Sequence, residues 1–327
     1  MNKNIKIFIN YFLGPLLFAW LSYSIYRQIV KQPQLEESWL SIRQSFQSYK
    51  INYLLGGILL IAVNWGLEAW KWMISVRTFY PIKFMQAYKA VLSGVSFSVT
   101  MPNRIGEYLG RIVYLPEGNR LKTISVTLVG SFSQLLITIF VGTLGFIFLK
   151  PSLFVQFPQL KIWYQFVLYG LIFVLVIMAL IYFNVAGTVG LFNRWIKSRQ
   201  YAYLVEALQE FHNKLLFRLL MLSLFRYVIF IIQYVLVFYL FEVNVPIATI
   251  ATVMSVVFLA MAVIPSIALV EVWLRGEISI KLMGLFSLNT LGIGFTSVTV
   301  WFINLILPAI TGSLLLLSLR VFKNEDR

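Results

Sequence analysis

A short charged segment between two apolar stretches carries the residue types best suited to binding chemistry. Within this first motif, residues 100–111, the side chains of Arg104, Glu107 and Arg111 are spaced to share one face of a helix. A charge inserted into hydrocarbon costs roughly 2.5–3.5 kcal/mol, so such residues usually line a protein interior or a wet cavity. Guanidinium groups match phosphate oxygens in a bidentate way. We therefore predict a polar head-group site here, with an ordinary surface pair of Glu107 and Arg111 as the alternative.

A second motif, residues 265–276, repeats this arrangement. Glu271 and Arg275 have the same four-residue spacing as Glu107 and Arg111. Both motifs follow a short apolar stretch, residues 84–100 and 247–264, and a proline marks the end of each stretch. We expect Pro102, Gly106 and Pro265 to be structural helix breaks. Two broken helices in corresponding positions are typical of an inverted repeat, so we expect Glu271 and Arg275 to take part in head-group binding as well.

Four further polar positions fall within or beside apolar segments. Arg226 and Gln233 lie seven residues apart on one helix face, and they are candidates to line the same cavity. For Arg226 we prefer the alternative, that its side chain extends to the cytoplasmic interface. We expect Glu68 and Lys71, near the end of an apolar segment flanked by Trp70 and Trp72, to form an interfacial pair.

The composition defines the elements that must position these residues. Hydrophobic residues make up 60% of the 327-residue chain and charged residues only 12%, which indicates an integral membrane protein. We predict an all-α polytopic fold in a single membrane domain, 1–327, with about six full transmembrane helices and two re-entrant or short helical hairpins. Its first half, about 1–160, would contain the first motif, and its second half, about 161–327, the second. The full spans are expected at about 8–29, 51–72, 123–149, 163–183, 219–241 and 293–319.

Several kinds of chemistry are excluded by residues that the sequence lacks. There is no cysteine, the single aspartate is Asp326 and the single histidine is His212. A histidine-rich zinc site and an Asp-x-Asp metal site are therefore excluded, and no phosphate-binding Gly-x-x-x-x-Gly-Lys-Ser/Thr segment is present. We expect no metal and no cofactor, and a transporter rather than an enzyme.

The distribution of basic residues predicts the orientation. The net charge of +15 is typical of a membrane protein with basic cytoplasmic loops facing anionic lipid, and does not require a nucleic-acid partner. If the N-terminus is cytoplasmic and both short stretches re-enter, 18 of the 27 Lys and Arg residues lie inside and 8 outside, with Arg226 within a span. This bias predicts a cytoplasmic-membrane protein of bacterial type with both termini inside.

The first motif resembles a family signature. The run Pro102-Asn103-Arg104-Ile105-Gly106-Glu107, followed by Arg111, is similar to the Pro-x-Arg-x-Gly-Glu…Arg pattern of the lysylphosphatidylglycerol synthase transmembrane region. That region is the flippase-like domain of multiple peptide resistance factor, and it is also found in stand-alone proteins. The second motif is similar to the family's later Pro-x-Gly-Gly-x-Gly-x-x-Glu element, but Ile267, Ala268 and Val270 replace its usual glycines.

The resemblance implies a lipid-moving membrane domain without the cytoplasmic synthase domain, since the chain ends at Arg327 soon after its last predicted span. The first functional hypothesis is a translocase that moves a phospholipid or lipid-linked molecule across the cytoplasmic membrane, with membrane lipids, mainly anionic head groups, as partners. A second is a membrane transferase acting on a lipid carrier, with Glu107 or Glu271 as general base. A third is a non-catalytic partner of a separate synthase or glycosyltransferase.

Overall fold

The computed structural model describes residues 35–100, 106–185, 210–264 and 268–323, together with Tyr23, Gly187 and Leu208. This part of the chain is helical and contains no strand, which confirms the all-α prediction. Its α-helices are α3 (Leu35–Gln47), α4 (Ile51–Val76), α5 (Phe84–Thr100), α6 (Gly106–Ile112), α7 (Arg120–Gln156), α8 (Leu160–Phe183), α11 (Asn213–Leu240), α12 (Ile247–Val263), α13 (Ala268–Met283), α14 (Thr290–Trp301) and α15 (Leu307–Lys323). The 3₁₀-helix η3 (Glu117–Asn119) precedes α7, and the π-helix η5 (Phe302–Ile306) joins α14 to α15.

The long apolar helices are those that the sequence predicts as membrane spans. Five helical segments of the described chain are long and apolar enough to cross a membrane: α4, α7, α8, α11 and the continuous segment Thr290–Leu316. They coincide with five of the six expected spans, and the first expected span, 8–29, lies outside the described residues except for Tyr23. The chain is therefore a multi-pass membrane protein, and the exposed aromatic side chains of α8, such as Phe166 and Phe173, are suited to contact with lipid.

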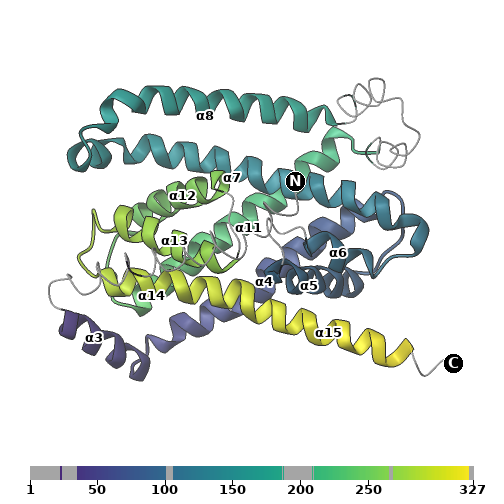
Figure 1. Cartoon of the computed structure of the whole chain (residues 1–327), viewed down its shortest axis with the longest axis horizontal. Helices are drawn as coiled ribbons and strands as arrows, with labels where there is room; N and C mark the ends of the chain where they lie inside the picture. Colours follow the sequence, from purple (N-terminus) through teal and green to yellow (C-terminus); the bar gives the residue numbers. More distant parts are fainter. Residues whose placement is uncertain are drawn as a thin grey trace.

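Helices α4 and α11 form the centre of the molecule. They pack extensively against each other, and both also contact α7. Figure 1 shows α7 and α8 side by side along one edge, with α4 and α11 crossing the middle and α15 on the opposite side. Two clusters of buried apolar side chains hold this arrangement together, one around Trp72 and Leu219 and the other around Phe238 and Met254.

The two short stretches fold as helices, each followed by a second helix. Helices α5 and α12 both have 17 residues, which corresponds to roughly 25 Å of helix and is marginal for a crossing. Helices α5 and α6 lie at one end of the molecule in Figure 1, while α12 and α13 lie toward the other. Helix α13 also contacts α5, so elements of the two motif regions meet. These features agree with an inverted repeat, which stays a prediction.

Glycines allow the helices of the first pair to approach closely. A Cβ atom built on Gly94 of α5 would lie 2.7 Å from the carbonyl oxygen of Glu107, and one built on Gly106 or Gly110 of α6 would overlap the backbone of α5. A side chain at any of these positions would therefore separate the two helices. The glycine spacing in the first motif thus serves close backbone packing, as in other membrane helix pairs.

Candidate functional site

A single carboxylate lies at the centre of a buried ionic cluster. Glu68 of α4 accepts hydrogen bonds through Oε1 from Arg111 Nη2 at 3.0 Å and through Oε2 from Arg226 Nη1. The Nζ atom of Lys71 lies 2.8 Å from the same Oε2 atom. Three cations from α4, α6 and α11 therefore converge on the two oxygens of one side chain. All four residues are buried, with 6% of Glu68, 1% of Lys71, 2% of Arg111 and 8% of Arg226 exposed.

A second carboxylate borders the cluster on its more open side. Glu107 Oε2 accepts a hydrogen bond from Arg111 Nη2 at 3.2 Å, and its side chain is 16% exposed. Among the described residues, the cluster therefore contains three cations and two carboxylates, an excess of one positive charge when all are ionised. The Nε atom of Arg111 is also buried without a hydrogen-bond partner in the described part of the chain. Excess positive charge and an unused donor are both suited to an anionic ligand.

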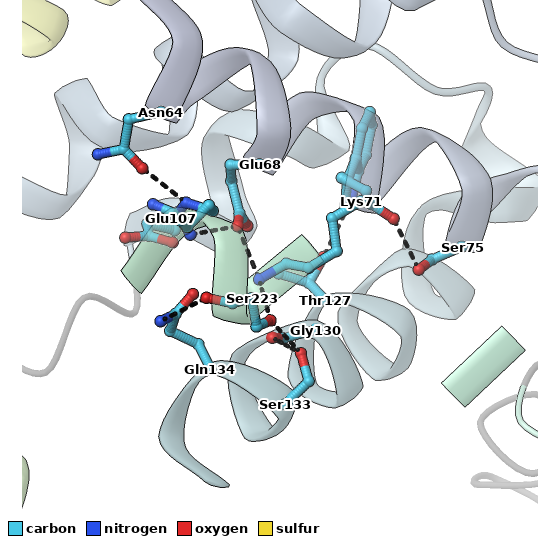
Figure 2. A network of polar contacts seen from close by, with 12 residues as sticks. Asn64, Glu68, Lys71, Ser75, Glu107, Thr127, Gly130, Ser133, Gln134 and Ser223 are labelled. Atoms are coloured by element: carbon cyan, nitrogen blue, oxygen red, sulfur yellow. Dashed lines mark hydrogen bonds and ion pairs between the residues drawn. The ribbon is translucent and has the colours of Figure 1, made fainter. Parts of the chain in front are cut away.

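The pattern of helix α4 explains why its polar groups meet. Asn64, Glu68 and Lys71 are spaced four and three residues apart, which places them on one face that packs against α11. Figure 2 shows these three side chains projecting from the same helix toward the polar cluster. The Glu-x-x-x-Arg spacing of α6 brings Glu107 and Arg111 to a common face in the same way.

A surrounding set of polar contacts fixes the charged groups. Asn64 accepts a hydrogen bond from Arg226 Nε at 2.9 Å and donates to Asn304 Oδ1 at 3.2 Å. Asn304 belongs to the π-helix η5, a wider turn of the kind often found at functional sites. Lys71 Nζ donates to Ser223 Oγ at 3.3 Å, and that hydroxyl is 2.8 Å from the hydroxyl of Ser133 (Figure 2).

The structure corrects two expectations about individual residues. Glu68 and Lys71 do not form an interfacial pair, because both side chains are buried between α4, α7 and α11. Arg226 does not extend to the interface, because its guanidinium group is held by Asn64, by Glu68 and by the ring of Trp65, 5.5 Å from its Cζ atom. In both cases long-range ionic partners outweigh the local preference for water.

The residues of the second motif form a separate pair. Arg275 Nη2 donates to Glu271 Oε1, and Arg275 Nη1 donates to the hydroxyl of Tyr234 at 3.4 Å. Tyr234 is on α11, eight residues or about 12 Å along the helix from Arg226. Helix α11 therefore contributes one side chain to the cluster around Glu68 and another to the pair of Glu271 and Arg275. Gln233, predicted to share a cavity with Arg226, instead donates through Nε2 to the carbonyl oxygen of Gly57 at 2.9 Å.

The remaining predicted site residues are only partly placed. Gly106 is the first described residue of helix α6, and its role as a helix break stays a prediction. Arg104, Pro102 and Pro265 lie outside the described residues. Sequence reasoning missed the roles of Asn64, Glu68 and Lys71, although three polar residues at helical spacing within an apolar segment were the signal that could have found them.

The geometry defines the class of this protein, and one comparison defines its family. The fold and the cluster are those of a polytopic helical membrane protein with a buried, cationic polar site. In the described residues no group of His, Asp and Glu side chains is arranged to hold a metal ion. The chain belongs to the family described as the lysylphosphatidylglycerol synthase TM region, which matches residues 12–270. Comparisons with curated proteins and with solved structures gave no match. The family membership confirms the sequence resemblance and supports a membrane function related to lipids.

Proposed function

We propose that this protein is a lipid translocase that moves a phospholipid or lipid-linked molecule across the cytoplasmic membrane. The observation that carries this proposal is the buried cluster of Lys71, Arg111 and Arg226 around Glu68, with Glu107 on its more exposed side. Ionisable side chains inside a membrane protein are costly and generally mark a substrate or ion pathway. Because the cluster has more cations than carboxylates, a phosphate group is the chemistry that complements it best.

The cluster around Glu68 and the pair of Glu271 and Arg275 suggest how a head group would move. The lipid phosphate would bind first to the guanidinium groups at the cluster on the cytoplasmic side, where the orientation prediction places α5 and α6. Glu271 and Arg275 would then interact with the head group nearer the outer side, about two helical turns further along α11. Broken helices that enter from opposite sides suit this role, because their movement can open the site alternately to each side.

The acyl chains need no enclosed path in this proposal. The exposed surface of the spanning helices is strongly apolar, as on α8, so the chains can stay in the surrounding lipid while the head group passes through the polar interior. The contribution of the protein is then to replace the water lost by the phosphate with charged hydrogen bonds, which lowers the cost of bringing that group into the membrane.

A head-group accessibility assay in proteoliposomes tests the proposal. Fluorescently head-labelled phosphatidylglycerol would be reconstituted with the full chain, and its movement between leaflets followed with a membrane-impermeant quencher. We expect Arg104→Ala to slow translocation by about tenfold, roughly 1.4 kcal/mol, because a phosphate contact is lost. We expect Glu107→Gln to slow it by a similar factor, because Arg111 loses the carboxylate that orients it. Arg120→Ala is the matched control, because Arg120 forms an exposed pair with Glu117 outside the cluster. Wild-type rates in both site variants would show that the site is assigned wrongly.

A further inference from the structure

The position of Glu68 among the cations raises the question of what this carboxylate does when a lipid phosphate binds. Its Oε1 atom forms an ion pair with Arg111, and its Oε2 atom forms ion pairs with Arg226 and Lys71. These are the donors that a bound phosphate would need. Glu107 differs from Glu68, since it contacts Arg111 alone among these three cations in the described structure.

We propose that Glu68 is an internal counterion that occupies the phosphate position in the lipid-free state and must be displaced when a lipid head group binds. This inference rests on the proposed function and adds a regulatory step to it. Without Glu68, Lys71, Arg111 and Arg226 would be buried close together without a central anion, an arrangement that is strongly destabilising. The carboxylate therefore stabilises the empty site and at the same time competes with the ligand.

The chemistry of the two anions explains how displacement would occur. A carboxylate offers two acceptor oxygens, which three cations share here. The phosphodiester of phosphatidylglycerol also has two charged oxygens, but it is not tethered to α4, and its ester oxygens add weak acceptor positions. It can also use Arg111 Nε, which has no partner in the described structure. The excess positive charge of the cluster attracts the phosphate, and competition from Glu68 keeps its binding weak enough to permit release. A carrier needs both properties, because a head group that binds too tightly is not passed on.

The inference predicts a defined order of affinities. Binding of phosphatidylglycerol to the purified full chain in detergent would be measured by titration for the wild type, Glu68→Gln, Glu68→Asp and Glu107→Gln. We expect Glu68→Gln to bind about tenfold more tightly than the wild type, because it loses the competing charge. Glu68→Asp keeps the charge but is one methylene shorter, so it cannot reach all three cations equally well, and we expect an intermediate affinity. Translocation by Glu68→Gln in proteoliposomes should be slower than wild type, because release of the head group becomes limiting.

Glu107→Gln is the control that separates competition from net charge. It adds the same unit of positive charge to the cluster as Glu68→Gln but leaves the central anion in place. Equal tightening in Glu68→Gln and Glu107→Gln, with Glu68→Asp unchanged, would show that only net charge matters and would overturn the inference. Weaker or unchanged binding in Glu68→Gln would overturn it too.

The same titration distinguishes this inference from the proposed function. If the wild type binds and translocates phosphatidylglycerol but the Glu68 variants show no gain in affinity, the counterion role fails and the translocase proposal stands. If the wild type neither binds nor translocates the lipid, both proposals fail together. The Glu68→Asp variant keeps the inference testable if Glu68→Gln does not fold, because its charge is conserved.

Discussion

At the scale of single residues, the cluster depends on polar partners that have no charge of their own. Asn64 connects Arg226 to Asn304 and so links α4, α11 and the π-helix η5. Asn64 and Asn304 are buried, at 0% and 7% exposure. A buried donor or acceptor that loses its partner costs about 1–3 kcal/mol, so these amides stabilise the position of Arg226 as well as the helix contacts.

We therefore predict that Asn64→Leu lowers the free energy of unfolding by about 1–3 kcal/mol, because Arg226 Nε and Asn304 Oδ1 lose their bonds to Asn64. Thermal unfolding in detergent measures this loss. Asn213→Leu makes the same chemical change at the exposed start of α11, where we expect a change within about 0.5 kcal/mol. A similar loss in both variants would contradict the structural role of Asn64.

At the scale of secondary-structure elements, two contacts determine how the charged groups are presented. The glycines of α5 and α6 bring Arg111 close enough to α4 to reach Glu68, because a larger residue would hold α6 away. At the other end of α4, Lys50 forms an ion pair with Glu242, which follows α11. Helices α4 and α11 are thus joined by ionic contacts in two places, which keeps their polar faces in register.

Gly110→Ala should destabilise the protein by about 1–3 kcal/mol, the usual cost of overpacking, because the added methyl group overlaps the backbone at Ser93 and Gly94. The variant should also translocate lipid more slowly, since Arg111 moves with α6. Gly66→Ala in α4 is the matched control. A methyl group there has no neighbour within 4 Å, so alanine should leave stability unchanged or raise it by up to about 1 kcal/mol. Equal stability of the two variants would exclude tight packing of α5 on α6.

The pair of Lys50 and Glu242 predicts a pH dependence of stability. Burial alone would raise the pKa of Glu242, but hydrogen bonds from Lys50 and from Ser45 (2.7 Å) outweigh it and hold this pKa below its ordinary value. A carboxyl whose pKa is lower in the folded state stabilises that state above its unfolded pKa of 4.5, and this contribution is lost as the pH falls through the folded pKa.

The wild type should therefore be more stable than Glu242→Gln at pH 7, by up to about 1 kcal/mol, and this difference should shrink as the pH is lowered below 4.5. Thermal unfolding of both proteins between pH 7 and about pH 3 measures it, because the loss occurs below pH 4.5. A difference that does not depend on pH would show that the carboxylate charge of Glu242 contributes nothing.

At the scale of the whole molecule, the five described spans alternate in direction, so their ends lie on two opposite sides of the bundle (Figure 1), and the orientation with a cytoplasmic N-terminus stays a prediction. The turn that precedes α7 and the turn between α7 and α8 lie at opposite ends of a single long helix. With a cytoplasmic N-terminus, the first of these turns would be inside and the second outside. Since the native chain has no cysteine, single cysteines can report on each side without background.

We expect Gln159→Cys, in the turn before α8, to react with a membrane-impermeant maleimide in intact cells. Gly118→Cys, in η3, should react only after the membrane is permeabilised. Both positions are exposed, so a difference in labelling reports the side of the membrane rather than burial. The opposite labelling pattern would reverse the orientation, and with it the side on which the ionic cluster would receive its lipid.

The class of the fold and most of its helices follow from local sequence. Long apolar runs must form helices in a membrane, so the five described spans and the stretches 84–100 and 247–264 could be predicted from local composition. The first motif also identified Glu107 and Arg111, because a glutamate and an arginine four residues apart share a helix face whatever the fold.

Which charges meet depends on the packing of helices that are far apart in the sequence. Glu68 is 43 residues from Arg111 and 158 from Arg226, and no helical period connects positions that far apart. The packing of α4 against α11, and the close approach of α6 that its glycines permit, bring Arg111 and Arg226 to the carboxylate that Lys71 already reaches from the next turn of α4. Glu68, which its sequence neighbours Trp70 and Trp72 suggested was at the membrane interface, is therefore at the centre of the site. Its burial among opposite charges depends on the whole fold and not on local sequence.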